Sequence, residues 1–218
     1  MSDRLALGVL ASGRGSNFQA IVDQIEAGSL HAEIRVLITD NAGAYALERA
    51  KAHSIAAVHI SPQEFSSKDA FFGAVVEQLK ARGVELVVLA GFMRIVRKPL
   101  IDAYPHRIMN IHPALLPSFP GLHGQRQAVE YGVKISGCTV HFVDEGMDTG
   151  PVIIQAAVPV SSDDSEETLS ERILRMEHRI FPEAIRLYAE GRLRVEGRMV
   201  RIEGYGLRDE QVVNPPLR

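Results

Sequence analysis

The feature that most constrains the fold is a short apolar run that leads straight into a glycine-rich loop. Residues 5–10 read LALGVL and residues 11–17 read ASGRGSN. An apolar run of this length predicts a buried strand, and the glycines predict a sharp turn after it. Apolar residues then recur at helical spacing as far as residue 27, so the chain opens with a strand, a loop and a helix.

The alternation of strand and helix continues through the first half. We expect strands at 34–39, 56–60 and 86–90, and helices at 44–52 and 66–82. Such alternation is typical of βαβ units, which place parallel strands in one sheet with helices on both faces. The predicted fold class is therefore α/β, with a Rossmann-like and mostly parallel sheet.

The second half is richer in strands. Strands are expected at 107–111, 135–143 and 152–160, a helix at 125–131, and an exposed hairpin in 193–204. A long helix should start at a cap formed by Asp163 or Asp164 and run to Glu190, with a kink or break near Pro182. Because no linker separates the halves, we expect one domain over 1–218, with a lobe at 1–104 and a mixed lobe at 105–218.

Charge and cysteine content exclude several classes of protein. The net charge of −3 gives no global positive field, so no nucleic-acid partner is expected. A single cysteine, Cys138, forms no internal disulfide and no zinc site, so no metal is expected. No segment approaches the roughly 20 apolar residues of a membrane helix, and no signal peptide is recognisable. We expect a cytoplasmic monomer or homodimer that acts on small molecules and binds no membrane.

The first glycine-rich loop, Ser12–Asn17, suits a phosphate group. A loop between a strand and a helix points backbone N–H groups at its ligand, and the helix dipole adds positive potential. No Gly-Lys-Ser/Thr follows, which excludes a Walker A loop, and Phe18 interrupts a dinucleotide fingerprint. Asp40 nevertheless ends the next strand, where a dinucleotide site has its ribose acid. The alternative is a tight turn in which Ser16 or Asn17 caps the helix.

The second chemical signal is Asn110 and His112 in NIHPALLPSFPGLHG. Two residues apart on a strand, their side chains share one face, and they lie where an open parallel sheet binds its ligands. An amide that donates a hydrogen bond and a histidine that carries a proton near neutral pH can together stabilise an oxyanion and transfer a proton. The alternative is a capping asparagine and a packed histidine before a proline turn.

The third signal is the loop DEGMDTGP, residues 144–151. Its acids are Asp144, Glu145 and Asp148, and its glycines allow sharp turns. One of these carboxylates could orient a histidine and keep it protonated. The alternatives are a solvated loop or a calcium-like loop, although the spacing does not fit an EF-hand.

Taken together, these loops resemble the glycinamide ribonucleotide formyltransferases. The resemblance runs from ASGRGSN to about Leu193 and rests on five motifs in family order: GSN, VLAGFMRIV, NIHPALLPSFPGLH, HFVDEGMDTGPVI and EHRIFPEAIRLYAEGRL. It implies the formyltransferase fold and a direct transfer of the formyl group from 10-formyltetrahydrofolate, the cosubstrate, to the amine of 5'-phosphoribosylglycinamide. This reaction belongs to de novo purine biosynthesis.

The resemblance also assigns residues to roles. Asn110 and His112 would stabilise the tetrahedral oxyanion, and Asp148 would keep His112 protonated, with His141 as support behind them. The residues implied for the ribonucleotide and its phosphate are Gly13, Gly15, Ser16, Asn17 and Glu177. The residues implied for the folate are Phe92, Met93, Arg94, Ile95, Val96, Phe142, Val143, Asp144 and Asp148.

Related reactions remain as alternatives. Methionyl-tRNA formyltransferases add a tRNA-binding domain, and formyltetrahydrofolate deformylases pass the formyl group to water and carry an extra N-terminal domain. Sugar-nucleotide formyltransferases also offer an amine and phosphates. A non-catalytic nucleotide-binding domain on the same sheet is the alternative from another class, and it should bind nicotinamide or adenine nucleotides without folate.

Overall fold

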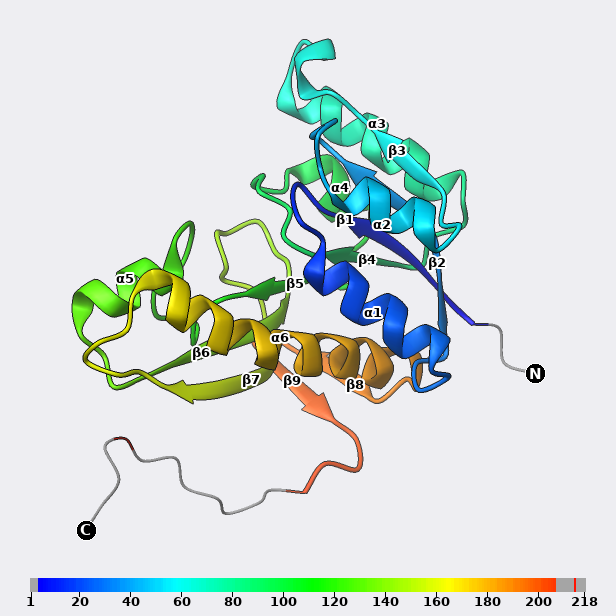
Figure 1. The fold of residues 1–218 in the computed structure, drawn as a ribbon. Coiled ribbons are helices and arrows are strands. Elements are labelled where there is room, and N and C mark those ends of the chain that lie inside the picture. Colours follow the sequence, from blue (N-terminus) through cyan, green and yellow to red (C-terminus); the bar gives the residue numbers. More distant parts are fainter. Residues whose placement is uncertain (1–3, 207–213, 215–218) are drawn as a thin grey trace.

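The computed structural model describes residues 4–206 and 214 of the chain, and these build one nine-stranded sheet. The strand order is β3-β2-β1-β4-β5-β6-β7-β9-β8, as Figure 1 shows. The strands are β1 (Leu5–Leu10), β2 (Ala32–Thr39), β3 (Ala57–His59), β4 (Leu86–Leu89), β5 (Ile108–His112), β6 (Ile135–Phe142), β7 (Val152–Pro159), β8 (Leu193–Glu196) and β9 (Met199–Ile202). The predicted α/β class is confirmed, and one sheet continues through both halves of the chain.

The direction of the strands changes in the middle of the sheet. The first five strands in sheet order, β3-β2-β1-β4-β5, pair in parallel, whereas β6 runs antiparallel to both β5 and β7. The carboxyl ends of β1, β2, β4 and β5 therefore lie on one edge, which is the ligand-binding edge of such sheets. Two of the three chemical signals lie at this edge, in the loop after β1 and at the end of β5, whereas the loop 144–151 follows the antiparallel strand β6.

Helices cover both faces of the sheet. They are α1 (Ser16–Glu26), α2 (Ala46–Ala52), α3 (Lys68–Lys80), α4 (Lys98–Ala103), α5 (Gly124–Tyr131) and α6 (Glu166–Ala189), with a short 3-10 turn at Pro62–Glu64. Helices α1, α2, α5 and α6 supply residues to one apolar core, and α3 and α4 supply the core on the opposite face. Among the described residues no helix is both long enough and apolar enough to cross a membrane.

Helix α6 differs from the prediction at its start and at its proline. Its cap is Ser165, whose hydroxyl accepts from the Thr168 N–H while the Thr168 hydroxyl accepts from the Ser165 N–H. Asp164 is held instead by Arg172, at 2.6 Å, two turns into the helix. The helix runs unbroken through Pro182, which is buried. Packing of this long amphipathic face outweighs the single hydrogen bond that a proline removes.

The Ser165→Ala variant should lose about 1 kcal/mol of unfolding free energy, because the first turn of α6 loses its reciprocal cap. Urea unfolding monitored by circular dichroism measures this loss. Ser161→Ala is the matched control, since its hydroxyl also accepts one N–H at 3.3 Å, that of Asp163, but this bond lies before the helix and caps none of its turns. Equal stability of the two variants would contradict the capping role.

Two further elements depart from the predicted pattern. Helix α4 and the 3-10 turn lie in stretches that were not predicted to be helical, and a proline stands in the first turn of each. The predicted C-terminal hairpin is formed by β8 and β9, and β9 also joins the sheet beside β7 through Met199 and Val152. Arg198, at the turn of this hairpin, donates to the Thr149 carbonyl at 3.1 Å.

Candidate active site

The loop after β1 has the shape of an anion site. Gly15 stands at the N-cap position of α1 with φ 68°, and no side chain caps the helix. The alternative interpretation of this loop, a turn in which Ser16 or Asn17 caps the helix, is therefore wrong. A Cβ on Gly15 would lie 2.8 Å from the Ala46 Cβ, so both the backbone conformation and the space require glycine. With no side chain over the helix start, the first N–H groups of α1 stay available to a ligand.

Beside this loop, a buried carboxyl group meets a buried amide. Asn17 Nδ2 donates to Glu177 Oε2 at 2.7 Å, and both residues are less than a tenth exposed. Burial raises the pKa of Glu177, and the hydrogen bond from Asn17 offsets part of that rise. Asn17 Oδ1 is buried and has no partner in the described part of the chain. This pair therefore offers unused polar atoms next to the anion loop, where hydroxyl groups of a ligand would complete them.

The difference in unfolding free energy between the Glu177→Gln variant and the unsubstituted protein should depend on pH. Because burial raises the folded pKa, the unfolded chain releases this proton at lower pH, and stability falls as pH rises above the ordinary glutamate value of 4.5. The variant has no such proton to release. We expect it to be the more stable protein at pH 7, with a difference that shrinks toward pH 4.5.

Urea unfolding at the two pH values measures this difference, and the exposed Glu171→Gln on the same helix is the control. A stability difference that is the same at pH 4.5 and pH 7 would show that ionisation of Glu177 is not its cause.

Strand β5 brings Asn110 next to a histidine of β6. The register pairs Asn110 with His141, and Asn110 Nδ2 lies 3.1 Å from His141 Nε2. His141 Nδ1 faces the Phe142 carbonyl at 2.8 Å and must donate to it, which leaves Nε2 as an acceptor. Burial lowers the pKa of His141, in keeping with this neutral form. His141 thus fixes the amide of Asn110 with one N–H engaged and the other free to donate.

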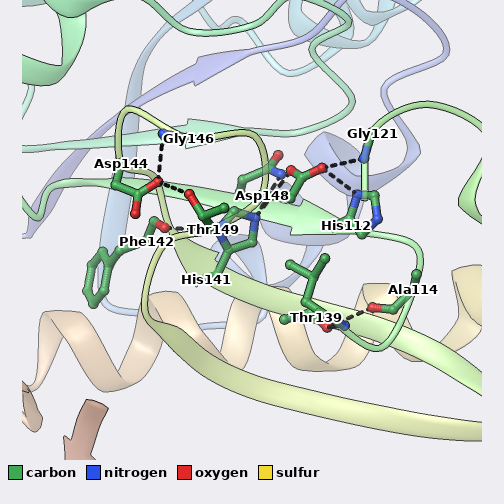
Figure 2. Close-up of polar contacts among 12 residues, drawn as sticks. His112, Ala114, Gly121, Thr139, His141, Phe142, Asp144, Gly146, Asp148 and Thr149 are labelled. Atoms are coloured by element: carbon green, nitrogen blue, oxygen red, sulfur yellow. Dashed lines mark hydrogen bonds and ion pairs between the residues drawn. The ribbon is translucent and has the colours of Figure 1, made fainter. Parts of the chain in front are cut away.

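His112, the second predicted residue of β5, is buried, and Figure 2 shows Asp148 beside its ring. Its Nε2 lies 2.8 Å from the Phe119 carbonyl, and its Nδ1 lies 3.5 Å from Asp148 Oδ2. A doubly protonated ring can donate to both oxygens. The structure therefore brings His112 and Asp148 together, whereas Asn110 donates its hydrogen bond to His141.

Asp148 lies between the two histidines, as Figure 2 shows. Its Oδ2 accepts from the Gly121 N–H at 2.7 Å, and its Oδ1 is 3.7 Å from His141 Nε2. Its backbone has φ 54°, a left-handed conformation that costs energy for any residue other than glycine. The loop is held in shape by Asp144, which accepts from the Thr149 hydroxyl at 2.6 Å and from the Gly146 N–H at 3.1 Å.

Thr139 is a site residue that was not predicted from the sequence. It is fully buried, and its hydroxyl donates to the Ala114 carbonyl at 2.7 Å and accepts from the Leu116 N–H at 3.1 Å. These bonds anchor the loop that carries the Phe119 carbonyl. Its signal in the sequence is a polar residue two positions before His141 in a predicted strand, and hence on the same face.

The segment after β4, residues 92–96, borders both loops. The Met93 N–H donates to the Ser12 hydroxyl at 2.9 Å, and Phe92 and Val96 pack in an apolar cluster that Val143 also contacts. The side chains of Met93 and Ile95 are 65% and 60% exposed. The two segments predicted to bind folate are thus neighbours, with apolar side chains turned outward beside them.

Arg94 was predicted to face the carboxylate side of a folate. Its Nε lies 2.6 Å from Asp40 Oδ2, and its guanidinium lies 5.8 Å from the centre of the Phe71 ring. Asp40, the residue considered as a ribose acid of a dinucleotide site, is therefore engaged by an arginine.

Comparison with known proteins decides the family. The model of the formyl transferase family matches residues 5–185. This chain belongs to the formyl transferase family. The match spans the anion loop, the segment 92–96, strands β5 and β6 and most of α6, so every part of the candidate site lies within it.

Similar curated proteins fall into two groups. The phosphoribosylglycinamide formyltransferase of Bacillus subtilis is 45% identical over 178 residues, covering 82% of this chain and 91% of its own length. The phosphoribosylglycinamide formyltransferase of Escherichia coli is 40% identical over 199 residues, covering 91% of this chain and 94% of its own length. The trifunctional purine biosynthetic protein adenosine-3 of Drosophila pseudoobscura pseudoobscura is 49% identical, but the match spans 14% of that much longer protein.

Solved structures lead to the same family. A glycinamide ribonucleotide transformylase from Symbiobacterium toebii has a TM-score of 0.91 and 55% identity, with 93% of this chain and 95% of that chain covered. A formyltetrahydrofolate deformylase from Pseudomonas syringae has a TM-score of 0.86 at 27% identity, and 66% of its chain is covered. The deformylase thus shares the fold and is longer than the matched region.

Proposed function

We propose that this protein transfers the formyl group of 10-formyltetrahydrofolate to the amine of 5'-phosphoribosylglycinamide, as expected from the motifs. The products are formylglycinamide ribonucleotide and tetrahydrofolate, in de novo purine biosynthesis. The relatives that match this chain over most of their own length are phosphoribosylglycinamide formyltransferases, which supports the assignment. The observation that carries it is the cluster of Asn110, His112, His141 and Asp148 beside an open anion loop.

The cluster suits the charges that develop in this reaction. When the amine attacks the formyl carbon, a C–N bond forms, negative charge builds on the formyl oxygen and positive charge on the nitrogen. The free N–H of Asn110 and the Nε2–H of His112 are the donors for that oxygen. In the structure Nε2–H points at the Phe119 carbonyl, 2.8 Å away, so the formyl oxygen takes the place of that carbonyl when it accepts from Nε2–H.

In this proposal Asp148, whose Oδ2 lies 3.5 Å from His112 Nδ1, pairs with the imidazolium form of His112 and receives the amine proton through water. The intermediate then breaks the C–N bond to tetrahydrofolate, whose nitrogen takes up a proton as it leaves. His112, Asn110 and Asp148 are the catalytic residues of this proposal, and His141 is a positioning residue that sets the amide of Asn110.

The two substrates occupy neighbouring segments. The phosphate lies on the N–H groups of Gly13, Gly15, Ser16 and Asn17, and Glu177 binds the ribose side. The pterin lies between residues 92–96 and 142–148, whose outward apolar side chains and backbone polar groups suit an aromatic ring with polar edges. We infer a phosphate-binding lobe at 1–104 and a catalytic and folate-binding lobe at 105–218, working in the cytoplasm without metal.

An assay of formyl acceptors tests this function. The protein is incubated with 10-formyltetrahydrofolate and one acceptor, and release of the tetrahydrofolate product is followed. We expect rapid turnover with 5'-phosphoribosylglycinamide and almost none with water, methionyl-tRNA or an amino-sugar nucleotide. Turnover that is unchanged when the amine is omitted would instead make the protein a deformylase.

A further inference from the structure

Three consecutive carbonyl groups of the anion loop, those of residues 12–14, face one neighbouring segment, residues 41–49. The three bonds are Asn41 Nδ2 to the Ser12 carbonyl at 3.1 Å, the Ala46 N–H to the Gly13 carbonyl at 3.1 Å, and Arg49 Nε to the Arg14 carbonyl at 2.9 Å. Three consecutive peptide groups of the loop are therefore fixed from the same side.

Fixing the carbonyls also fixes the donors. In a trans peptide the C=O and the N–H point in opposite directions, so a carbonyl held on one side turns the next N–H to the other. The N–H groups of Gly13, Arg14 and Gly15 are turned in this way, and none has an acceptor within the described part of the chain. Successive N–H groups converging at a helix start form a concave anion site.

Arg49 is itself held rigidly. Its Nη1 donates to Gln19 Oε1 at 3.0 Å, and its guanidinium lies 5.1 Å from the centre of the Tyr45 ring. Within residues 4–206 and 214, no carboxylate lies within ion-pair distance of it. Its positive charge is therefore fixed behind the loop and not neutralised by a partner.

Asn41 is held in the same manner. Its Oδ1 accepts from the Gly43 N–H at 3.0 Å and its own N–H donates to the Thr39 hydroxyl at 3.2 Å, which leaves Nδ2 aimed at the Ser12 carbonyl. The side chain is thus oriented from within its own turn, so its donor direction does not depend on the loop.

We propose that Asn41 and Arg49 are positioning residues for the phosphate of the substrate. Each sets the orientation of one peptide group so that its N–H faces the phosphate, and Arg49 adds positive potential from behind. The inference rests on the proposed function, because it takes the loop after β1 as the phosphate site. The two residues, Arg49 on α2 and Asn41 in the turn before it, act on the loop and do not touch the substrate.

Kinetics separates this role from a general effect on folding. The Arg49→Ala variant should raise KM for the phosphoribosyl amine by about tenfold, the loss of one hydrogen bond from a charged donor. KM for the folate and kcat should stay within about twofold, because the proposed function places the phosphate on the loop and the pterin and formyl group on other segments. Arg49→Lys should recover part of the affinity, since an ammonium can still donate to the Arg14 carbonyl.

Two comparisons refine the test. Lys51→Ala removes one positive charge from the same helix at an exposed position, and it should leave every constant unchanged. Asn41→Asp keeps the size of the side chain and its acceptor but loses the donor and adds a negative charge behind the phosphate, so it should raise the same KM at least as much as Asn41→Ala does. An equal rise in both KM values for Arg49→Ala would overturn the proposal.

Binding of inorganic phosphate to the full-length chain gives a readout without catalysis. Amide NMR shifts of Gly13 and Gly15 should move on titration of the unsubstituted protein, and Arg49→Ala should weaken that binding while Lys51→Ala does not. Equal phosphate affinity in all three proteins overturns the positioning role. Absence of any shift at the loop in the unsubstituted protein removes the phosphate site itself, and with it this inference.

Discussion

Replacement of His112 by alanine is expected to lower kcat by about 10²–10³, the usual effect of losing one oxyanion donor. The same range is expected for Asn110→Ala. Both residues lie on β5, and each is fixed by a neutral acceptor, the Phe119 carbonyl for His112 and His141 Nε2 for Asn110. Since these donors act on charge that exists only in the transition state, the binding of folate should change little.

Turnover under saturating substrate, together with folate affinity measured by calorimetry, checks this expectation. His59→Ala is the matched control, because His59 is exposed on β3 at the edge of the sheet. Near-normal turnover of the His112→Ala variant would reduce His112 to a packed histidine before a proline turn and would overturn the mechanism.

Asp148→Ala should lower kcat by about as much as His112→Ala does. The double variant should have about the same kcat as either single variant. Asp148 Oδ2 lies 3.5 Å from His112 Nδ1, so the two groups act as a unit in one step. Strictly additive losses in kcat would show that Asp148 works independently of His112.

Much of the fold could be predicted because it depends on local signals that agree with tertiary packing. The run at 5–10, the loop after it and the spacing in α1 all indicate one strand-loop-helix unit, and Phe18, Ile21 and Val22 are indeed buried. The start of α6 could not be predicted in this way. Asp164 is a good local cap, but Arg172 engages it from two turns away, and Ser165 takes the cap position.

Pro182 illustrates the same limit from the packing side. A proline removes one backbone donor and predicts a kink or break, yet α6 continues through it. Phe181 and Ile185, on either side, are fully buried in the core that α6 shares with α1. The energy of that burial depends on partners distant in sequence, so no local rule can weigh it against the lost hydrogen bond.

The candidate site shows where motif reasoning ends. The motifs single out Asn110, His112 and Asp148, and the structure gathers them at one edge of the sheet. Which histidine contacts Asn110 depends on the register of β5 and β6, which pairs Asn110 with His141 and His112 with Thr139. Register is a tertiary property, so the sequence could place His141 near the site but could not assign its bond.

Gly150→Ala is expected to reduce kcat by about 10² although Gly150 carries no functional group, because a displacement of about 1 Å at a catalytic group can cost that much. A Cβ at this position would lie 1.8 Å from the Phe142 carbonyl oxygen and 2.8 Å from its carbon. Both are backbone atoms of β6, and the Phe142 N–H is bonded to the Pro151 carbonyl at 2.9 Å, so the strand cannot move aside alone.

The base of the loop must therefore open in the Gly150→Ala variant, and Asp148, two residues earlier, moves relative to His112. Overpacking of this kind should also lower the unfolding free energy by about 1–3 kcal/mol. Gly73→Ala is the control: its added Cβ meets no atom within 4 Å, and alanine favours the helix α3 that contains it. If Gly150→Ala loses stability but keeps full kcat, the position of Asp148 does not set the rate, and the role proposed for its carboxylate fails with it.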